Sequence, residues 1–172
     1  MSSEHDARVS LTVIYDQIEA RTGAVVAADP AWPCRKGCDA CCRRLARAPE
    51  LSAAEWRYLW RGYGELPATV RAEVRARVMA LAGHEGHVVC PLLDRAAGAC
   101  LVYAHRPAAC RMYGFYLSRG EGRYCGDIEA RVEAGGCEQV VWGNHDAVDD
   151  RLRRRFGPPI SMLDWFSDMP DR

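Results

Sequence analysis

The sequence predicts a mainly α fold, a small single domain of short helices with a minor β-hairpin. Its 172 residues are 49% hydrophobic, which is enough apolar material for one modest core. Several stretches carry apolar residues at intervals of three and four, the spacing of one helix face. Four cysteines also stand within nine residues, at Cys34, Cys38, Cys41 and Cys42, where an ordinary core needs none. We therefore expect residues 1–172 to form one domain organised around a cysteine-ligated metal centre.

The N-terminal segment predicts a helix followed by a loop. Residues Met1 to Asp6 are expected to be mobile. From Ala7 to about Val25, one face of the predicted helix repeats the apolar side chains Leu11, Ile14, Tyr15 and Ile18. Pro30 and Pro33 then mark the loop that leads into the first cysteines.

Two helices are predicted between residues 52 and 83. Ser52 followed by Glu55 is a capping-box signature, and the helix that it opens is expected to end near Gly62 to Gly64. Pro67 suits the first turn of the next helix, which Gly83 closes. The apolar stripe of this second helix consists of Val70, Val74, Val78 and Leu81.

A small hairpin is predicted after these helices. The segments Val88 to Leu93 and Ala99 to Tyr103 are apolar and partly β-branched, and residues 94–98 have the composition of a turn between them. Pro91 would have to lie at a sheet edge or at a strand end, because proline has no N–H to donate.

The rest of the chain is expected to be helical again. A short helix begins in the segment Arg106 to Arg111, and another is expected from Asp127 to Glu133. Asn144 is predicted to cap a helix that Gly157 ends, and Ser161 is predicted to cap a last short one. No internal repeat and no long linker divides the chain.

Nine cysteines and a balanced charge narrow the classes of protein. The chain opens without the basic and apolar regions of a secretion signal, and no apolar run approaches the roughly 18 residues that a membrane span needs. We therefore expect a cytoplasmic protein without a membrane partner, in which reduced thiols bind metal rather than pair as disulfides. The net charge of +0 gives no general attraction to nucleic acid, so none is expected as a partner.

The first cysteine motif has the pattern C-x3-C-x2-C-C. Thiolates this close together can bind one soft metal centre, because sulfur is a preferred ligand of zinc and of iron–sulfur clusters. Gly37 and Pro33 suit a loop that curls tightly around an ion. Adjacent Cys41 and Cys42 are expected to point in different directions, so they could serve two metals, or one could merely pack. Radical S-adenosylmethionine enzymes share part of this spacing, but the chain lacks the length and the alternating elements of their barrel.

Five single cysteines follow the first motif. None of them forms a C-x2-C knuckle, which argues against a zinc ribbon and favours a centre assembled from separate segments. Each could also be a buried core thiol, because cysteine is among the most buried residue types. These five candidate ligands are Cys90, Cys100, Cys110, Cys125 and Cys137.

Several other polar side chains stand near these cysteines in the sequence. His84 and His87 lie among glycines and are predicted to be solvated rather than metal-bound. Arg106, Arg111 and Tyr113 lie around Cys110, the third of the five single cysteines. The arginines could offset the negative charge of a thiolate centre or receive an anionic substrate, or they could be ordinary surface residues.

Five blocks of sequence occur in a fixed order along most of the chain. They are Cys34-x3-Cys38-x2-Cys41-Cys42, Cys90-Pro91-Leu92-Leu93, Gly98-Ala99-Cys100-Leu101-Val102-Tyr103, Arg106-Pro107-Ala108-Ala109-Cys110-Arg111 and Gly157-Pro158-Pro159-Ile160. Together they resemble the YkgJ-type cysteine-cluster family, which is described as a zinc- or iron-chelating domain. The resemblance implies that Cys90, Cys100 and Cys110 join the first four cysteines as metal ligands. It implies that one further thiol follows these blocks as a ligand, without choosing between Cys125 and Cys137. The usual first motif of the family, C-x2-C-x2-C-C, has one residue fewer than the motif of this chain.

The cysteine-rich part of flagellin lysine methylases is similar to this family, and that likeness implies a [4Fe–4S] cluster. The sequence therefore favours an iron–sulfur cofactor, with zinc as the alternative. An iron–sulfur protein could transfer electrons or bind a small substrate at an open iron. The competing hypotheses are a zinc-binding structural or interaction module and a protein that handles a soft metal such as Cu(I). Whether the chain is an enzyme, and which small-molecule or protein substrate it takes, is left open.

Overall fold

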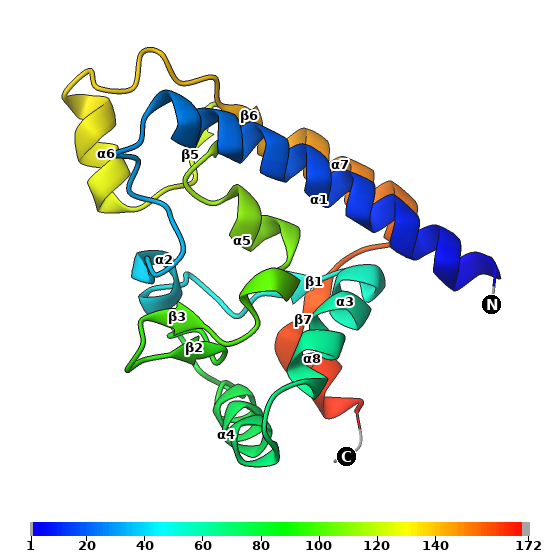
Figure 1. The fold of residues 1–172 in the computed structure, drawn as a ribbon. Helices are drawn as coiled ribbons and strands as arrows, with labels where there is room; N and C mark the ends of the chain where they lie inside the picture. The colour runs from blue at the N-terminus through cyan, green and yellow to red at the C-terminus, as the bar shows by residue number, and fades with distance from the viewer. Residues whose placement is uncertain (1, 170–172) are drawn as a thin grey trace.

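The computed structural model of the chain describes the backbone of residues 2–169 and the side chains of residues 10–169. The predicted mainly α fold is confirmed in this part of the chain, and none of the helices there is both long and apolar enough to cross a membrane. The helices are α1 (Ser2–Ala28), α2 (Ala40–Arg43), α3 (Ala53–Gly64), α4 (Ala68–Met79), α5 (Ala108–Met112), α6 (Gly126–Glu133), α7 (His145–Phe156) and α8 (Met162–Ser167), with a 3-10 turn η1 (Tyr103–His105) before α5 (Figure 1).

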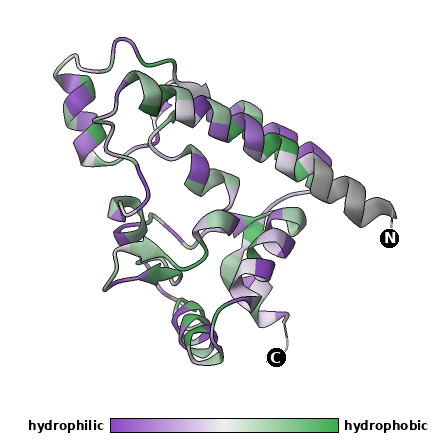
Figure 2. Ribbon diagram, in the orientation of Figure 1, coloured by the Kyte–Doolittle hydropathy of each residue, from purple (hydrophilic) through white to green (hydrophobic). Residues whose placement is uncertain are grey.

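Helix α1 lies along one edge of the molecule, with α7 beside it and α5 packed against it (Figure 1). Its inward face is the predicted one, because Leu11, Ile14 and Ile18 are all buried. Its ends lie beyond those predicted, so the backbone from Ser2 to Asp6 is helical, while Met1 lies outside the described residues. Figure 2 shows hydrophilic and hydrophobic residues alternating along α1 and α7, as expected of helices with one face in the core.

A second core lies between α3, α4 and α8. Trp56 of α3 stacks on Trp165 of α8, with ring centroids 5.6 Å apart and an interplanar angle of 7°. Phe166 is fully buried and meets the Trp56 ring edge-on at 5.1 Å. Val74 and Val78 of the predicted stripe on α4 are also fully buried. These contacts hold the C-terminal helix against the middle of the chain.

Helix α3 begins with the predicted capping box. The Glu55 N–H donates to the Ser52 hydroxyl at 3.4 Å, and the Ser52 N–H donates to the Glu55 carboxylate at 3.0 Å. The other oxygen of Glu55 accepts a hydrogen bond of 3.0 Å from the N–H of Ala108, the first residue of α5. The capping box therefore also ties α3 to the helix that carries Cys110.

We expect Ser52→Ala to lower the free energy of unfolding by about 1–2 kcal/mol, because a helix cap of this kind is lost at a buried site. Urea denaturation measures the change. Ser161→Ala is the matched control, since its hydroxyl caps α8 at a partly exposed site, 3.2 Å from the Leu163 N–H. If Ser161→Ala lowered the free energy of unfolding as much as Ser52→Ala, burial would not explain the effect of the Ser52 cap.

The predicted hairpin is confirmed, although its strands are shorter than expected. Strands β2 (Leu93–Asp94) and β3 (Ala99–Cys100) pair antiparallel. Gly98 ends the turn with a φ of 62°, in the left-handed region that glycine adopts most easily. Pro91 lies before the first strand, in keeping with its missing N–H donor.

The described residues form two further small sheets, which the sequence did not predict. Strand β1 (Glu50–Leu51) pairs antiparallel with β7 (Ile160–Ser161). Strand β4 (Tyr116–Ser118) pairs with β5 (Glu121–Gly122) and, in parallel, with β6 (Gly143–Asn144). Strands of two or three residues are too short to show the alternating pattern by which a strand is predicted.

Candidate metal centre

The loop that carries the first cysteines is anchored at its start by Trp32. The indole ring is 1% exposed, and its centroid lies 5.9 Å from the ring of Phe115 and 5.8 Å from that of Trp142. Just before it, Asp29 forms an ion pair with Arg131 of α6. The segment that enters the cysteine motif is therefore held by α6 and by residues next to the three-stranded sheet.

Cys41 and Cys42 lie together on the single turn of α2. Their sulfur atoms are 3.9 Å apart, although adjacent residues were expected to point in different directions. Gly37, with a φ of 94°, makes the predicted tight turn before the helix. Asp39 and Arg43 form an ion pair of 2.5 Å across α2. The two neighbouring thiols therefore share one site.

Backbone pairing brings Cys90 beside α2. Its N–H donates to the Cys42 carbonyl at 2.7 Å, and Leu45 and Val88 exchange two backbone hydrogen bonds of 2.9 and 2.8 Å. Strand β3 and helix α5 each bring one further thiol to the same place. A cavity of about 40 Å³ is lined by the thiol-bearing residues Cys38, Cys41, Cys42, Cys90, Cys100 and Cys110.

Cys34 and Cys125 extend this group of thiols toward α6. Burial first, and then the neighbouring thiols of Cys125 and Cys38, raise the pKa of Cys34 to about 12. The backbone of Gly114 passes so close that a Cβ atom there would lie 2.3 Å from the Cys34 sulfur. Cys125 itself is the N-cap residue of α6.

Cys137 is a buried thiol that belongs to the lining of neither thiol-lined cavity. It is 7% exposed and belongs to the hydrophobic core cluster that includes Ile128 and Trp32. Its environment is that of a core side chain.

Burial raises the pKa of several of these thiols above the usual value of a cysteine. The hydrogen bond with Cys41 lowers the pKa of Cys42, but a second hydrogen bond with Cys90 and burial raise it to about 12. Burial likewise raises the pKa of Cys100 and of Cys110. A metal that binds these groups as thiolates must displace their protons, so its affinity is expected to rise with pH.

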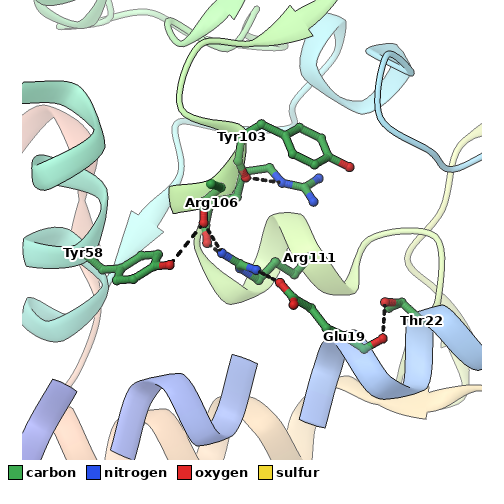
Figure 3. Close-up of polar contacts among 7 residues, drawn as sticks. Glu19, Thr22, Tyr58, Tyr103, Arg106 and Arg111 are labelled. Carbon is green, nitrogen blue, oxygen red and sulfur yellow. Dashed lines mark hydrogen bonds and ion pairs between the residues drawn. The ribbon is translucent and has the colours of Figure 1, made fainter. Parts of the chain in front are cut away.

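Arg106 places a positive charge against these thiols. Its guanidinium lies 3.6 Å from the centre of the Tyr103 ring, and its Nε donates to the Tyr103 carbonyl at 3.1 Å (Figure 3). Burial raises the pKa of Cys34 and of Cys100, and the charge of Arg106 opposes that rise. The position of Arg106 therefore suits the predicted role of offsetting thiolate charge.

Arg111 has a different role from those considered for it. Its side chain is 6% exposed, and it forms an ion pair with Glu19 of α1 (Figure 3). It also donates to the carbonyls of Arg106, at 2.8 Å, and Ala104, at 2.6 Å. Arg111 is thus neither a surface residue nor open to an anionic substrate, and it fixes the backbone that carries Arg106.

His84, His87 and His105 are absent from the lining of the thiol cavity. His84 and His87 are both exposed, and the His84 Nε2 lies 3.1 Å from the His87 carbonyl, which fits their predicted solvation. His105 packs on Tyr58, with ring centroids 4.9 Å apart. Among the described residues, no histidine lines the thiol cavity.

The donor set suits a soft metal but is not arranged as a finished coordination shell. Among residues 10–169, no three His, Cys, Asp or Glu side chains are grouped so that they could hold an ion. The organisation of the fold around a metal centre therefore stays a prediction. The 3.9 Å between the sulfurs of Cys41 and Cys42 nevertheless matches the edge of about 3.8 Å in a sulfur tetrahedron with zinc–sulfur bonds of about 2.3 Å.

A larger cavity of about 660 Å³ opens on the same thiols. Cys41, Cys42, Cys90 and Cys110 belong to its lining, together with Tyr113. The sequence did not predict the part of this lining that comes from the β4–β5 hairpin, the residue after it and α7, because only the fold brings these polar residues together. They include Arg119, Arg123, His145, Asp149 and Arg153.

Comparison with known families identifies this arrangement of cysteines. A family model described as "CxxCxxCC: Putative zinc- or iron-chelating domain" matches residues 33–138, more than half of the chain and all nine of its cysteines. Searches of curated proteins and of solved structures gave no match. The match supports metal binding and leaves the choice between zinc and iron open. The chain belongs to the CxxCxxCC family of zinc- or iron-chelating domains.

Proposed function

We propose that this protein holds an iron–sulfur cluster of the [4Fe–4S] type at the cavity lined by six cysteines. The observation that carries the proposal is the convergence of thiols from four separate segments, namely 38–42, Cys90, Cys100 and Cys110. A [4Fe–4S] cluster takes four cysteine ligands, so each segment can supply one. Because these ligands bind different irons, thiols that arrive from different directions suit a cluster.

The larger cavity favours a reactive centre over a purely structural one. A structural zinc site is closed by its four ligands and needs no access for other molecules. Here a cavity of about 660 Å³ reaches four of the same thiol-bearing residues. A bound cluster with four cysteine ligands would supply electron transfer, and one with three would leave an iron open to a substrate. Arg106 would then offset part of the negative charge of the thiolates.

The metal and sulfide content of protein purified without oxygen tests this proposal. We expect iron with an equal amount of acid-labile sulfide, and a brown colour that bleaches in air. Stoichiometric zinc without sulfide would overturn the cluster. The measurement needs no knowledge of the substrate.

Zinc is a second candidate, favoured by the short distance between Cys41 and Cys42. Two sulfurs 3.9 Å apart fit ligands of one tetrahedral ion better than ligands of two separate irons. The protein would then be a structural or interaction module. A soft-metal carrier would differ from that module by releasing its ion readily to a chelator.

We expect Cys137→Ala to keep the full metal content and Cys110→Ala to lose most of it. Cys110 lines the thiol cavity, whereas Cys137 is a core side chain. Elemental analysis per chain measures the difference, and Cys137→Ala should lower the free energy of unfolding by only about 1 kcal/mol. Loss of metal from a folded Cys137→Ala variant would instead indicate that Cys137 is a metal ligand.

A further inference from the structure

A strained arginine stands at the turn beside the larger cavity. Strands β4 and β5 are joined by Arg119 and Gly120, which have φ values of 52° and 81°. A two-residue hairpin turn with positive φ at both positions is of type I′ and strongly favours Asn-Gly. Among the described residues, Arg119 is the one non-glycine with positive φ. Such strain at a residue with a long charged side chain points to a function for that side chain.

Two further arginines line the same cavity as Arg119. Arg123 follows β5, and Arg153 comes from α7. In the part of the chain that the structure describes, no hydrogen bond or ion pair engages the guanidinium of Arg119 or Arg153, and Arg123 makes one bond of 3.3 Å to the Ser118 hydroxyl. These three side chains therefore keep N–H donors free for a ligand.

Four of the five acidic side chains in this cavity have partners within the protein. Two accept hydrogen bonds: Asp146 from the Ser118 hydroxyl and the Arg119 N–H at 2.8 Å each, and Glu55 from the capping box and the Ala108 N–H. Two lie in longer ion-pair contacts, Glu50 at 3.7 Å from Arg47 and Asp149 at 3.5 Å from His145. The fifth is the exposed Glu121. The groups left to recognise a ligand are thus mainly the three guanidiniums.

We propose that this cavity binds a small molecule with an oxyanion group, a carboxylate or a phosphate, and presents it to the metal centre. Planar guanidinium groups bind the oxygens of both anions through paired, charge-assisted hydrogen bonds. The volume of about 660 Å³ is that of a small-molecule site, and four cysteines line it. This inference rests on the proposed function for the role of the thiols, but the anion site does not depend on which metal they hold.

Two alkylating reagents of different charge test the site on the full chain. Iodoacetate is an anion and iodoacetamide is neutral, and both modify thiols. In the proposed centre the segment 38–42 supplies only one ligand, so at least one of Cys41 and Cys42 stays free to react. We expect the ratio of the iodoacetate rate to the iodoacetamide rate at that free thiol to fall roughly two- to fivefold in Arg119→Asn. Arg153→Gln should lower the ratio similarly, and the difference should vanish near 1 M salt, where charges are screened beyond about 3 Å. Peptide mass spectrometry follows each cysteine.

Stability supplies a second readout for Arg119. Asparagine fits the left-handed turn position better than arginine, so Arg119→Asn should keep or raise the melting temperature while it lowers the rate ratio. A purely structural role for Arg119 would instead lower the melting temperature and leave the ratio unchanged. The matched control is Arg95→Asn, which removes one charge from the exposed turn of the β2–β3 hairpin, outside the cavity.

A rate ratio unchanged in both Arg119→Asn and Arg153→Gln, or lowered equally by Arg95→Asn, would overturn the anion site. Acetate and inorganic phosphate, added at equal ionic strength, distinguish the two ligand classes by which of them slows alkylation by iodoacetamide. Protection by neither anion would also overturn the proposal. Protein that shows the anion preference but contains no metal would contradict the proposed function alone, so the two failures are distinguishable.

Discussion

Replacing Gly114 with alanine is expected to lower the free energy of unfolding by roughly 3 kcal/mol and to reduce the metal content. Gly114 has a φ of 85°, and an added Cβ would lie 2.3 Å from the Cys34 sulfur and 3.1 Å from the Ile128 Cδ1. The backbone cannot easily move away, because the Gly114 N–H donates to the Arg123 carbonyl at 2.7 Å. Urea denaturation, with and without a chelator, measures the loss of stability, and elemental analysis measures the metal.

Gly83→Ala is the matched control for this prediction. Gly83 also has a positive φ, of 70°, but nothing lies within 4 Å of an added Cβ. Its alanine variant therefore has the backbone strain without the contact, and we expect a loss of about 1 kcal/mol and an unchanged metal content. Equal losses in the two variants would mean that Cys34 yields to the new methyl group, and that its position is not fixed by Gly114.

The features that could be predicted from the sequence are those whose partners lie a few residues apart. The Ser52 capping box joins positions three apart, and Asn144 likewise accepts from the N–H of Ala147 at 3.0 Å. The β2–β3 hairpin closes around a short turn that ends in a glycine. In each case the pattern and the contact fall within one window of sequence, so local chemistry decides the structure.

The features that could not be predicted join residues far apart along the chain. Strand β1 pairs with β7 across more than a hundred residues, and two-residue strands leave no pattern for a partner to match. Arg111 and Glu19 form their ion pair between α5 and α1, although neither sequence neighbourhood indicates the other. The cavity lined by Arg119 and Arg153 depends in the same way on how the β4–β5 turn meets α7.

The cysteines include some that could be predicted from the local sequence and others that could not. Cys34, Cys38, Cys41 and Cys42 are recognisable from their spacing, because no core needs four thiols in nine residues. A single cysteine carries no such signal, since a ligand and a core thiol look alike in sequence. In the fold, Cys125 lies near Cys34, whereas Cys137 is buried in the hydrophobic core. That difference is tertiary and has no counterpart in a longer sequence motif, and which of the two binds metal stays a prediction.

Replacing Arg111 with methionine is expected to lower the free energy of unfolding by about 3 kcal/mol, although methionine preserves much of the side-chain volume. The guanidinium donates to the carbonyls of Arg106 and Ala104 and lies 4.2 Å from the centre of the Tyr15 ring. Its loss leaves two partly buried carbonyls with fewer donors, and urea denaturation measures the cost. Because the Arg106 carbonyl is one of these acceptors, the metal affinity should fall as well.

Two further variants separate the charge of Arg111 from its hydrogen bonds. The Glu19 side chain is 60% exposed, so Glu19→Gln should cost less than about 1 kcal/mol, and the amide oxygen can still accept from Arg111. Arg111→Lys keeps the charge but cannot reach all the acceptors with one nitrogen, so its loss should be intermediate. If Glu19→Gln cost as much as Arg111→Met, the ion pair would dominate, and the link from α1 to the Arg106 backbone would be electrostatic rather than a matter of satisfied carbonyls.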